Sequence, residues 1–181
     1  MTDHYIVTYS GRRFHYSEPR PEDVSLEDVA LALSNICRYG GHTFRFYSVA
    51  QHSVLVSRWC DPEDALAGLL HDASEAYLWD CPSPLKRLPE MEGYLELEER
   101  VQPVVARALG ASGAVPPSVL CADARVYLAE IRDFLPPEQY ETRSRWTRGL
   151  DPVPERIVPL SSHKARRAFL ARYWELRLLR G

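Results

Sequence analysis

The stretch LLHDASEAYLWD, residues 69–80, decides the fold of this 181-residue chain. It ends an apolar run that begins after an Asp-Pro pair typical of helix starts, and it predicts a helix over 62–78. The run is apolar on nearly every side, so we expect this helix at the centre of the molecule. Its polar residues His71, Asp72 and Glu75 are costly to bury unless a metal or hydrogen-bond partners compensate them. An internal His–Asp hydrogen bond or a partly exposed helix face would also explain them.

The whole sequence predicts a mainly α fold with about six helices and one short β-hairpin. A Ser-Gly turn between β-favouring segments predicts the hairpin over 5–16. Apolar stripes bounded by capping residues predict the other helices, over 26–39, 48–59, 91–109, 118–135 and 162–179. A segment rich in proline and arginine predicts a surface loop over 136–159. We expect one domain: a hairpin extension over 1–20, a core over 25–135, and a loop with a last helix over 136–181.

Two more polar residues lie in apolar surroundings on other predicted helices. His52 stands within SVAQHSVLV, and Asp123 stands within VLCADARVYL. Together with His71 and Asp72 they supply two imidazoles and two carboxylates from three helices. This mixed nitrogen and oxygen set suits one divalent ion such as Mn, Co, Zn, Fe or Mg, and it leaves positions for water and substrate. The sequence therefore predicts a catalytic metal site formed by these four residues.

The order of these four residues resembles the H…HD…D signature of HD-domain phosphohydrolases. The segment HDASEAYLWDCPSPLK, residues 71–86, resembles the corresponding stretch of the bacterial 5′-deoxynucleotidase branch, which also includes phage dATP triphosphohydrolases. The similarity covers roughly residues 25–135. It implies a single helical HD core, one bound divalent metal ion and hydrolysis of nucleotide phosphoesters.

The resemblance also implies roles for four residues outside the metal set. Glu75 would hold and polarise the attacking water, and Asp80 would protonate or orient the leaving sugar oxygen. Arg38 would bind the substrate phosphate with its guanidinium fork, and Tyr39 would pack on the nucleoside. From the residues alone, Arg38 fits a C-terminal helix cap equally well, and Tyr39 fits ordinary core packing.

Four further residues are candidates for contact with the substrate. Lys86, after the proline loop, could neutralise a phosphate, although a solvated loop charge is the more ordinary interpretation. The bulky Trp79 beside Asp80 could reshape the pocket for the base. Arg45 and His42 could line the mouth of the pocket or face solvent.

Two positions depart from many relatives. Gln51 stands where they have a glutamate, a difference that would change the charge around the first metal ligand and with it the preference for a metal. Leu120 stands where they often have a lysine. If that lysine contacts distal phosphates, this protein must use another cation or a shorter phosphate chain.

Composition narrows the classes of function. Apolar residues make up 45% and charged residues 26% of the chain, as in ordinary globular domains. The net charge of −3 without a basic stretch argues against nucleic-acid binding. The four scattered cysteines are typical of reduced thiols, and neither a membrane segment nor an export signal is visible. We expect a cytoplasmic homo-oligomer that does not bind membranes.

The leading hypothesis is a metal-dependent 5′-nucleotidase that acts on (deoxy)nucleoside monophosphates. A deoxynucleoside triphosphate triphosphohydrolase that releases triphosphate would use the same site, because either reaction needs the α-phosphorus at the metal. A noncatalytic HD domain that senses nucleotides is a third alternative, but it would not need the acids Glu75 and Asp80 beside a metal.

Overall fold

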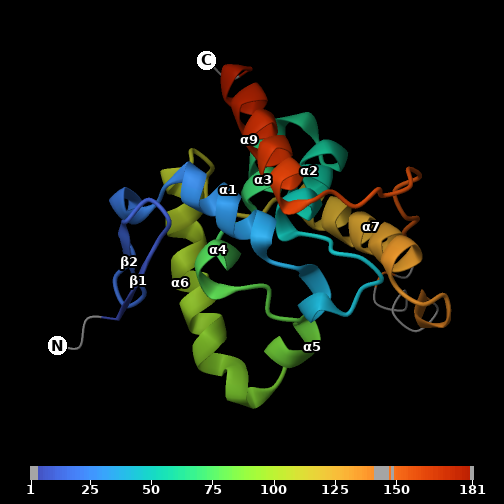
Figure 1. Cartoon of the computed structure of the whole chain (residues 1–181), viewed down its shortest axis with the longest axis horizontal. Helices are drawn as coiled ribbons and strands as arrows, with labels where there is room; N and C mark the ends of the chain where they lie inside the picture. The colour runs from blue at the N-terminus through green and yellow to red at the C-terminus, as the bar shows by residue number, and fades with distance from the viewer. Residues whose placement is uncertain (1–3, 141–146, 148, 180–181) are drawn as a thin grey trace.

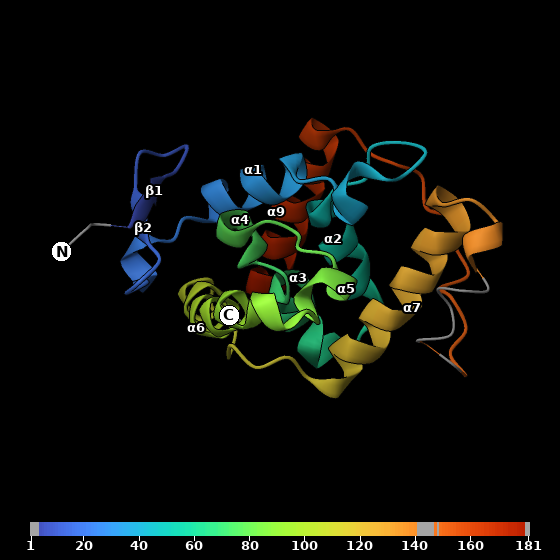
Figure 2. The ribbon, with the colours of Figure 1, turned by 90° about the horizontal axis from the view of Figure 1, so that it is seen from below.

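The computed structural model describes residues 4–140, 147 and 149–179, and its fold is mainly helical, as predicted. Helices α2 (Val49–Trp59) and α3 (Ala65–Leu70) lie in the middle of the fold (Figures 1 and 2). The other described helices are α1 (Leu26–Asn35), α4 (Glu75–Leu78), α5 (Ser83–Lys86), α6 (Glu92–Ala108), α7 (Pro117–Phe134) and α9 (Ser162–Leu178). Helix α2 packs against α1, α3, α7 and α9. His52 on α2 is consequently fully buried.

The predicted N-terminal hairpin is present. Strands β1 (Tyr5–Val7) and β2 (Arg13–His15) pair antiparallel, and Gly11 in their turn has a φ of 84°, which glycine adopts without strain. Phe14 of β2 is fully buried and stacks on Tyr77, with ring centroids 3.7 Å apart. Figures 1 and 2 place the hairpin and α7 at opposite ends of the molecule. The hairpin therefore covers the core at the end that is remote from α7.

The predicted helix over 62–78 is not continuous. A turn over 71–74 separates α3 from α4. The side-chain amide of Gln102, on α6, holds both sides of this turn: it donates to the carbonyl of Leu70 (2.8 Å) and accepts from the backbone amide of Ser74 (2.9 Å). This break and the short helix α5 give eight α-helices among the described residues, where about six were expected.

The first predicted helix ends earlier than expected. Helix α1 stops at Asn35, and Cys37 then pairs with Ser48 in an isolated antiparallel bridge. The backbone amide of Arg38 continues this pairing by donating to the carbonyl of Tyr47 (2.9 Å). The end of α1 is thereby joined to the start of α2. The other predicted helices begin and end within about one residue of their expected bounds, and the predicted loop over 136–159 lies partly outside the described residues.

Candidate metal centre

Two histidines and one aspartate converge where α3 ends against α2. His52 comes from the middle of α2, and His71 and Asp72 come from the turn after α3. The Nε2 atoms of the two histidines are 3.3 Å apart, and Asp72 Oδ2 lies 3.2 Å from His71 Nε2 and 3.5 Å from His52 Nε2. The three ligand atoms all lie within 4.8 Å of one another, so this group could hold a metal ion.

The fourth predicted ligand, Asp123 on α7, lies beside this group. Its Oδ1 atom is 3.2 Å from His52 Nε2, but it is not among the atoms that all lie within 4.8 Å of one another. The Asp123 side chain is 40% exposed, whereas that of His52 is fully buried. The structure thus brings three predicted ligands together and places the fourth at their open side.

The outer ring nitrogens of both histidines are held by hydrogen bonds. His71 Nδ1 lies 2.8 Å from the carbonyl oxygen of Gly68, which can only accept, so this nitrogen carries a proton. His52 Nδ1 lies 2.6 Å from Glu130 Oε1, an acceptor when the carboxylate is ionised. Both Nε2 atoms therefore face the same point as the carboxylate of Asp72. Two imidazole nitrogens and a carboxylate oxygen aimed at one point fit a divalent cation.

The charges around the histidines favour a positive charge between them. Burial and the Arg38 charge lower the pKa of His52, but Glu130 and the hydrogen bond to Asp123 outweigh them and raise it to about 9. Burial likewise opposes the effect of Asp72 on His71, and the net pKa of His71 is raised. The site can satisfy this preference with a proton or with a metal ion.

Glu130 is a site residue that the sequence reasoning missed. It lies on α7, is fully buried, and accepts hydrogen bonds from His52, Arg38 and Tyr39. Burial alone would raise the pKa of Glu130, but Arg38 and His52 lower it to about 2. A signal was available, because Glu130 follows Asp123 by seven residues and so shares its face of the helix, within the apolar run VYLAEI.

Glu75 and Asp80, the two predicted non-ligand acids, lie in different surroundings. Glu75 is 5% exposed, and among the described residues its Oε2 atom has no hydrogen-bond partner. Burial, followed by the charges of Asp72 and Asp80, raises the pKa of Glu75 well above its ordinary value. Burial also raises the pKa of Asp80, against the opposing effect of Arg38. Both carboxyl groups hold a proton more readily than ordinary acids, as groups that exchange protons with a substrate do.

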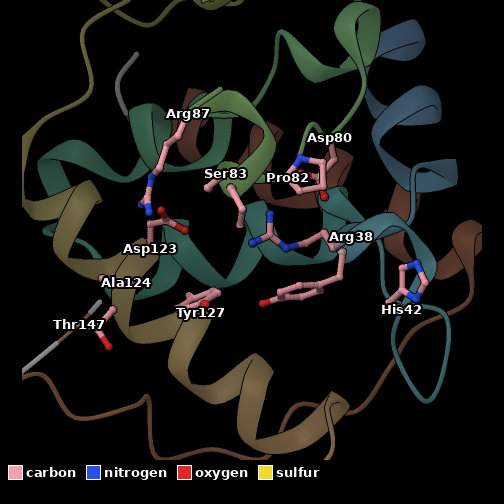
Figure 3. A pocket seen from close by; sticks show the side chains of 12 residues that line it. Arg38, His42, Asp80, Pro82, Ser83, Arg87, Asp123, Ala124, Tyr127 and Thr147 are labelled. Atoms are coloured by element: carbon pink, nitrogen blue, oxygen red, sulfur yellow. The ribbon is translucent and has the colours of Figure 1, made fainter. Parts of the chain in front are cut away.

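His52, His71 and Asp72 are called the metal group below, because together they could hold a metal ion. A cavity of about 500 Å³ opens beside this group (Figure 3). Asp80 and Asp123 both line it, and Arg38 and Tyr39 line it as well. In Figure 3 the Arg38 side chain points into the cavity from one side, and Arg87 points toward Asp123 from the other. The cavity therefore combines the edge of a cation site with two arginines, which suits an anionic ligand.

Arg87 and Tyr127 are among the lining residues that were not predicted. Tyr127 follows Asp123 by four residues and thus shares its helix face, and its ring lies 6.3 Å from the ring of Tyr39 in a stacked arrangement. Arg87 directly follows α5, one residue after the predicted Lys86. The helical spacing from Asp123 could have indicated Tyr127, but nothing in the sequence distinguishes Arg87 from its neighbour.

Three predicted substrate residues lie away from the cavity lining. Lys86 binds Glu98 on α6, with Nζ 2.5 Å from Oε1. The Trp79 side chain is 67% exposed, at a residue with a φ of 62° that is strained for a non-glycine. Arg45 is exposed in the loop before α2, while His42 of the same loop does line the cavity.

Gln51 makes its side-chain hydrogen bonds to the segment before α9, and its expected effect on the charge around the first metal ligand stays a prediction. Its side-chain amide donates to the carbonyl of Val158 (2.8 Å) and accepts from the backbone amide of Leu160 (2.8 Å). A glutamate could not make both bonds, because an ionised carboxylate only accepts. Gln51 thus fixes the segment before α9 against α2.

Comparison with known proteins finds relatives that are themselves uncharacterized. No protein-family model matches it. It is 37% identical over 180 residues to the uncharacterized protein YfdR of Escherichia coli (strain K12), an alignment that covers 97% of both chains. An uncharacterized protein of Rhodobacter capsulatus is 36% identical over 121 residues, 59% of each chain. Among the described residues, no helix has the length and hydrophobicity needed to cross a lipid bilayer.

Proposed function

The chain belongs to the family of the Escherichia coli protein YfdR, and we propose that it is a metal-dependent nucleotide phosphohydrolase of the HD type. We place it with the 5′-nucleotidases that act on (deoxy)nucleoside monophosphates. The observation that carries the proposal is the convergence of His52, His71 and Asp72 beside a cavity lined by Arg38 and Asp123. A cation site and a phosphate-binding side chain at one cavity are what phosphoester hydrolysis requires.

The metal would be held by the four predicted ligands, His52, His71, Asp72 and Asp123. When bound, the ion would act as a Lewis acid on the phosphate and lower the pKa of a water molecule. The mixed nitrogen and oxygen set suits Mn, Co, Zn, Fe or Mg, and we expect Mn or Co to support activity.

The chain's own residues would then carry the proton transfers. Glu75 would take a proton from the attacking water, whose oxygen forms a bond to phosphorus while the bond from phosphorus to O5′ breaks. Asp80 would give its proton to O5′, so that a nucleoside and inorganic phosphate leave. Arg38 would bind the phosphate oxygens, and the rings of Tyr39 and Tyr127 would offer apolar faces to the nucleoside. The buried, unpaired Oε2 atom of Glu75 supports this assignment.

A second candidate is a deoxynucleoside triphosphate triphosphohydrolase, and Arg87 favours it. The same bond to O5′ would break, but triphosphate would leave in place of phosphate. Arg87 lines the same cavity as Arg38, so a longer phosphate chain could meet two guanidinium groups.

The deciding experiment is a substrate panel. Protein stripped of metal and reloaded with Mn²⁺ is incubated with deoxynucleoside mono-, di- and triphosphates, and the products are separated chromatographically. We expect inorganic phosphate from monophosphates, whereas triphosphate as the product would establish the second candidate. No product from any nucleotide, with Mn²⁺ or Co²⁺, would reject both and favour a noncatalytic sensor. An Asp72→Asn variant should be inactive, which excludes contaminating phosphatases.

Two further parts of the proposal concern the cellular location and the oligomeric state of the protein. Nucleotides, the substrates that we propose, are cytoplasmic metabolites, so we place the protein in the cytoplasm. Trp174 and Leu178 on α9 are 55% and 81% exposed, which supports a homo-oligomer that would cover them. Sedimentation velocity of the wild type and of a Leu178→Glu variant would test that assembly.

A further inference from the structure

We propose that Glu130 is a positioning residue that couples the metal ligand His52 to the substrate-binding residues Arg38 and Tyr39. The inference rests on the proposed function for the roles of these three partners. Its own basis is the position of Glu130 on α7, where the side chain is fully buried and contacts all three.

The two carboxylate oxygens of Glu130 serve different partners. Oε1 accepts from His52 Nδ1 at 2.6 Å. Oε2 accepts from the Tyr39 hydroxyl at 2.6 Å, and from Nη2 and Nε of Arg38 at 3.1 and 3.3 Å. One rigid carboxylate therefore joins a metal ligand on one side to the substrate residues on the other. Since the group is buried, a partner that moves away leaves a carboxylate oxygen short of hydrogen bonds, which is costly.

On the metal side, Glu130 fixes the His52 ring. A hydrogen bond from Nδ1 holds the tautomer in which Nε2 carries the lone pair, and it sets the plane of the ring. Nε2 then faces Asp72 and His71. Loss of the Glu130 carboxylate should therefore weaken metal binding although Glu130 is not itself a ligand.

On the substrate side, Glu130 orients both Arg38 and Tyr39. It engages Nε and Nη2 of Arg38, while Nη1 lies 3.7 Å from Asp72 Oδ2, toward the metal group. A phosphate at the metal would meet that Nη1 edge. Tyr39 has a φ of 59°, which is unfavourable for a non-glycine, and its hydrogen bond to Glu130 helps to hold it there. Glu130 therefore contributes to the position of the Tyr39 ring in the cavity.

The first test is Mn²⁺ binding to the metal-free protein by isothermal titration calorimetry. Glu130→Gln should weaken Mn²⁺ affinity about 10- to 100-fold, the usual effect of removing a group that orients a ligand. A glutamine side chain has one acceptor oxygen and one donor NH2 group. Its NH2 group would face the N–H donors of either Arg38 or His52, so it cannot replace a carboxylate that accepts on both sides. Unchanged Mn²⁺ affinity in this variant would overturn the proposal.

The matched control is Asp28→Asn. Asp28 is another buried carboxylate, 4% exposed, which accepts from the hydroxyls of Thr8 (2.8 Å) and Ser10 (2.6 Å) next to the hairpin. This variant should lose thermal stability and keep wild-type Mn²⁺ affinity. An equal loss of Mn²⁺ affinity in Asp28→Asn would show that any buried acid has the same effect, and would overturn a specific role for Glu130.

The second test is a double-mutant cycle with inorganic phosphate as the probe, at saturating Mn²⁺. Arg38→Lys and Glu130→Gln should each weaken phosphate binding by at least about 2- to 10-fold, because the first removes the guanidinium fork and the second removes the hydrogen bonds that orient it. The double variant should bind phosphate no more weakly than Arg38→Lys alone, because Glu130 acts on the phosphate through Arg38. Additive losses would contradict the coupling. If Glu130→Gln does not fold, Glu130→Asp replaces it, since the shorter side chain keeps the charge but cannot reach both sides.

Both tests measure binding, so they separate this inference from the proposed function. A wild type that binds Mn²⁺ and phosphate but hydrolyses no nucleotide would reject the function and leave the coupling testable as described. An active wild type whose Glu130 variants bind both probes normally would reject the coupling and keep the function. A wild type that binds no Mn²⁺ would reject both.

Discussion

Glu75 and Glu130 are both buried acids near His52, His71 and Asp72, but they differ in their hydrogen bonds. Both oxygens of Glu130 are occupied by hydrogen bonds, whereas Oε2 of Glu75 has no partner among the described residues. A buried carboxyl oxygen without a partner destabilises the fold unless a water or ligand meets it. Glu75 therefore resembles a group that acts on bound water, and Glu130 a group that holds its neighbours in place.

This difference predicts that Glu75→Gln separates metal binding from turnover. The amide has nearly the shape of the carboxyl, so the variant should fold and bind Mn²⁺ as the wild type does. Its kcat should fall about 10²- to 10⁴-fold, because the amide cannot accept the proton of the attacking water. Metal content and kcat are measured on the same preparation. Glu98→Gln, on α6 and bonded to Lys86, is the control that should keep kcat. Loss of Mn²⁺ in proportion to activity would assign Glu75 to the metal ligands.

Single residues of the site could be predicted where a polar side chain interrupts an apolar run. His52, His71 and Asp72 stand out in this way, and the structure brings them together. Glu130 carries the same signal, but the charged Arg132 that follows it so closely makes its segment look like an exposed helix face.

Lys86 shows the limit of reasoning from resemblance alone. Successive residues of a helix point in directions about 100° apart. At the end of α5, the Lys86 side chain therefore meets Glu98, whereas the next residue, Arg87, lines the cavity. The phase of so short a helix depends on the packing around it, which a sequence pattern does not record.

At the scale of the elements, the metal group depends on the close approach of α2 and α3. Gly68 of α3 lies against α2, where an added Cβ would be 2.8 Å from Cys60 Sγ and 3.2 Å from Ser57 Cα. The second contact is with backbone, so the helices themselves would have to separate. This contact therefore sets the distance between His52 on α2 and His71 at the end of α3.

We predict that Gly68→Ala weakens both the fold and metal binding. Forcing α2 and α3 apart should lower the free energy of unfolding by about 1–3 kcal/mol, and Mn²⁺ affinity should fall with it. Gly93→Ala is the control: Gly93 lies in α6 with nothing within 4 Å of its added Cβ, so this variant should be as stable as the wild type or up to about 1 kcal/mol more stable. Urea unfolding and Mn²⁺ titration of both variants provide the comparison. A destabilised Gly68→Ala with normal Mn²⁺ affinity would show that the contact serves stability alone.

The elements themselves were predictable from apolar periodicity and capping residues, but the break between α3 and α4 was not. An apolar run predicts one helix, and no proline or glycine interrupts it over 69–78. The turn is held by Gln102, more than twenty residues later in the sequence, whose amide takes the freed carbonyl of Leu70 and the freed amide of Ser74. Such a tertiary hydrogen bond has no local sequence signal. The break matters for the proposed metal site because His71 and Asp72 lie in that turn.

At the scale of the whole molecule, folding gathers acidic groups from distant segments around one point. Asp72, Asp123 and Glu130 all have lowered pKa values, because His52, His71 and Arg38 offset the burial of their charges. Carboxylates whose pKa is lowered by folding contribute stability above their ordinary range and lose it as the pH falls. His52 behaves in the opposite sense, since its pKa is raised to about 9. The metal-free fold therefore loses stability as the pH falls and these carboxylates take up protons, and also as the pH rises and His52 loses its proton.

The stabilisation by metal should consequently grow with pH. Folded, metal-free protein holds the His52 proton more tightly than the unfolded chain, whose ordinary pKa is 6.5, so this contribution is complete below pH 6.5 and is lost as the pH rises through about 9. Mn²⁺ needs the neutral imidazole and binds only the folded form, so it competes with that proton and should add more stability as the proton leaves. The measurement is the melting temperature across this pH range, under argon, with a chelator and with saturating Mn²⁺. The gap between the two curves should widen toward alkaline pH and should vanish in a His52→Gln variant. Groups outside the predicted metal ligands titrate equally in both curves, and His71, whose pKa is also raised, changes the gap in the same direction as His52. A gap that stayed constant or was largest at acidic pH would therefore show that the metal does not bind at these two histidines.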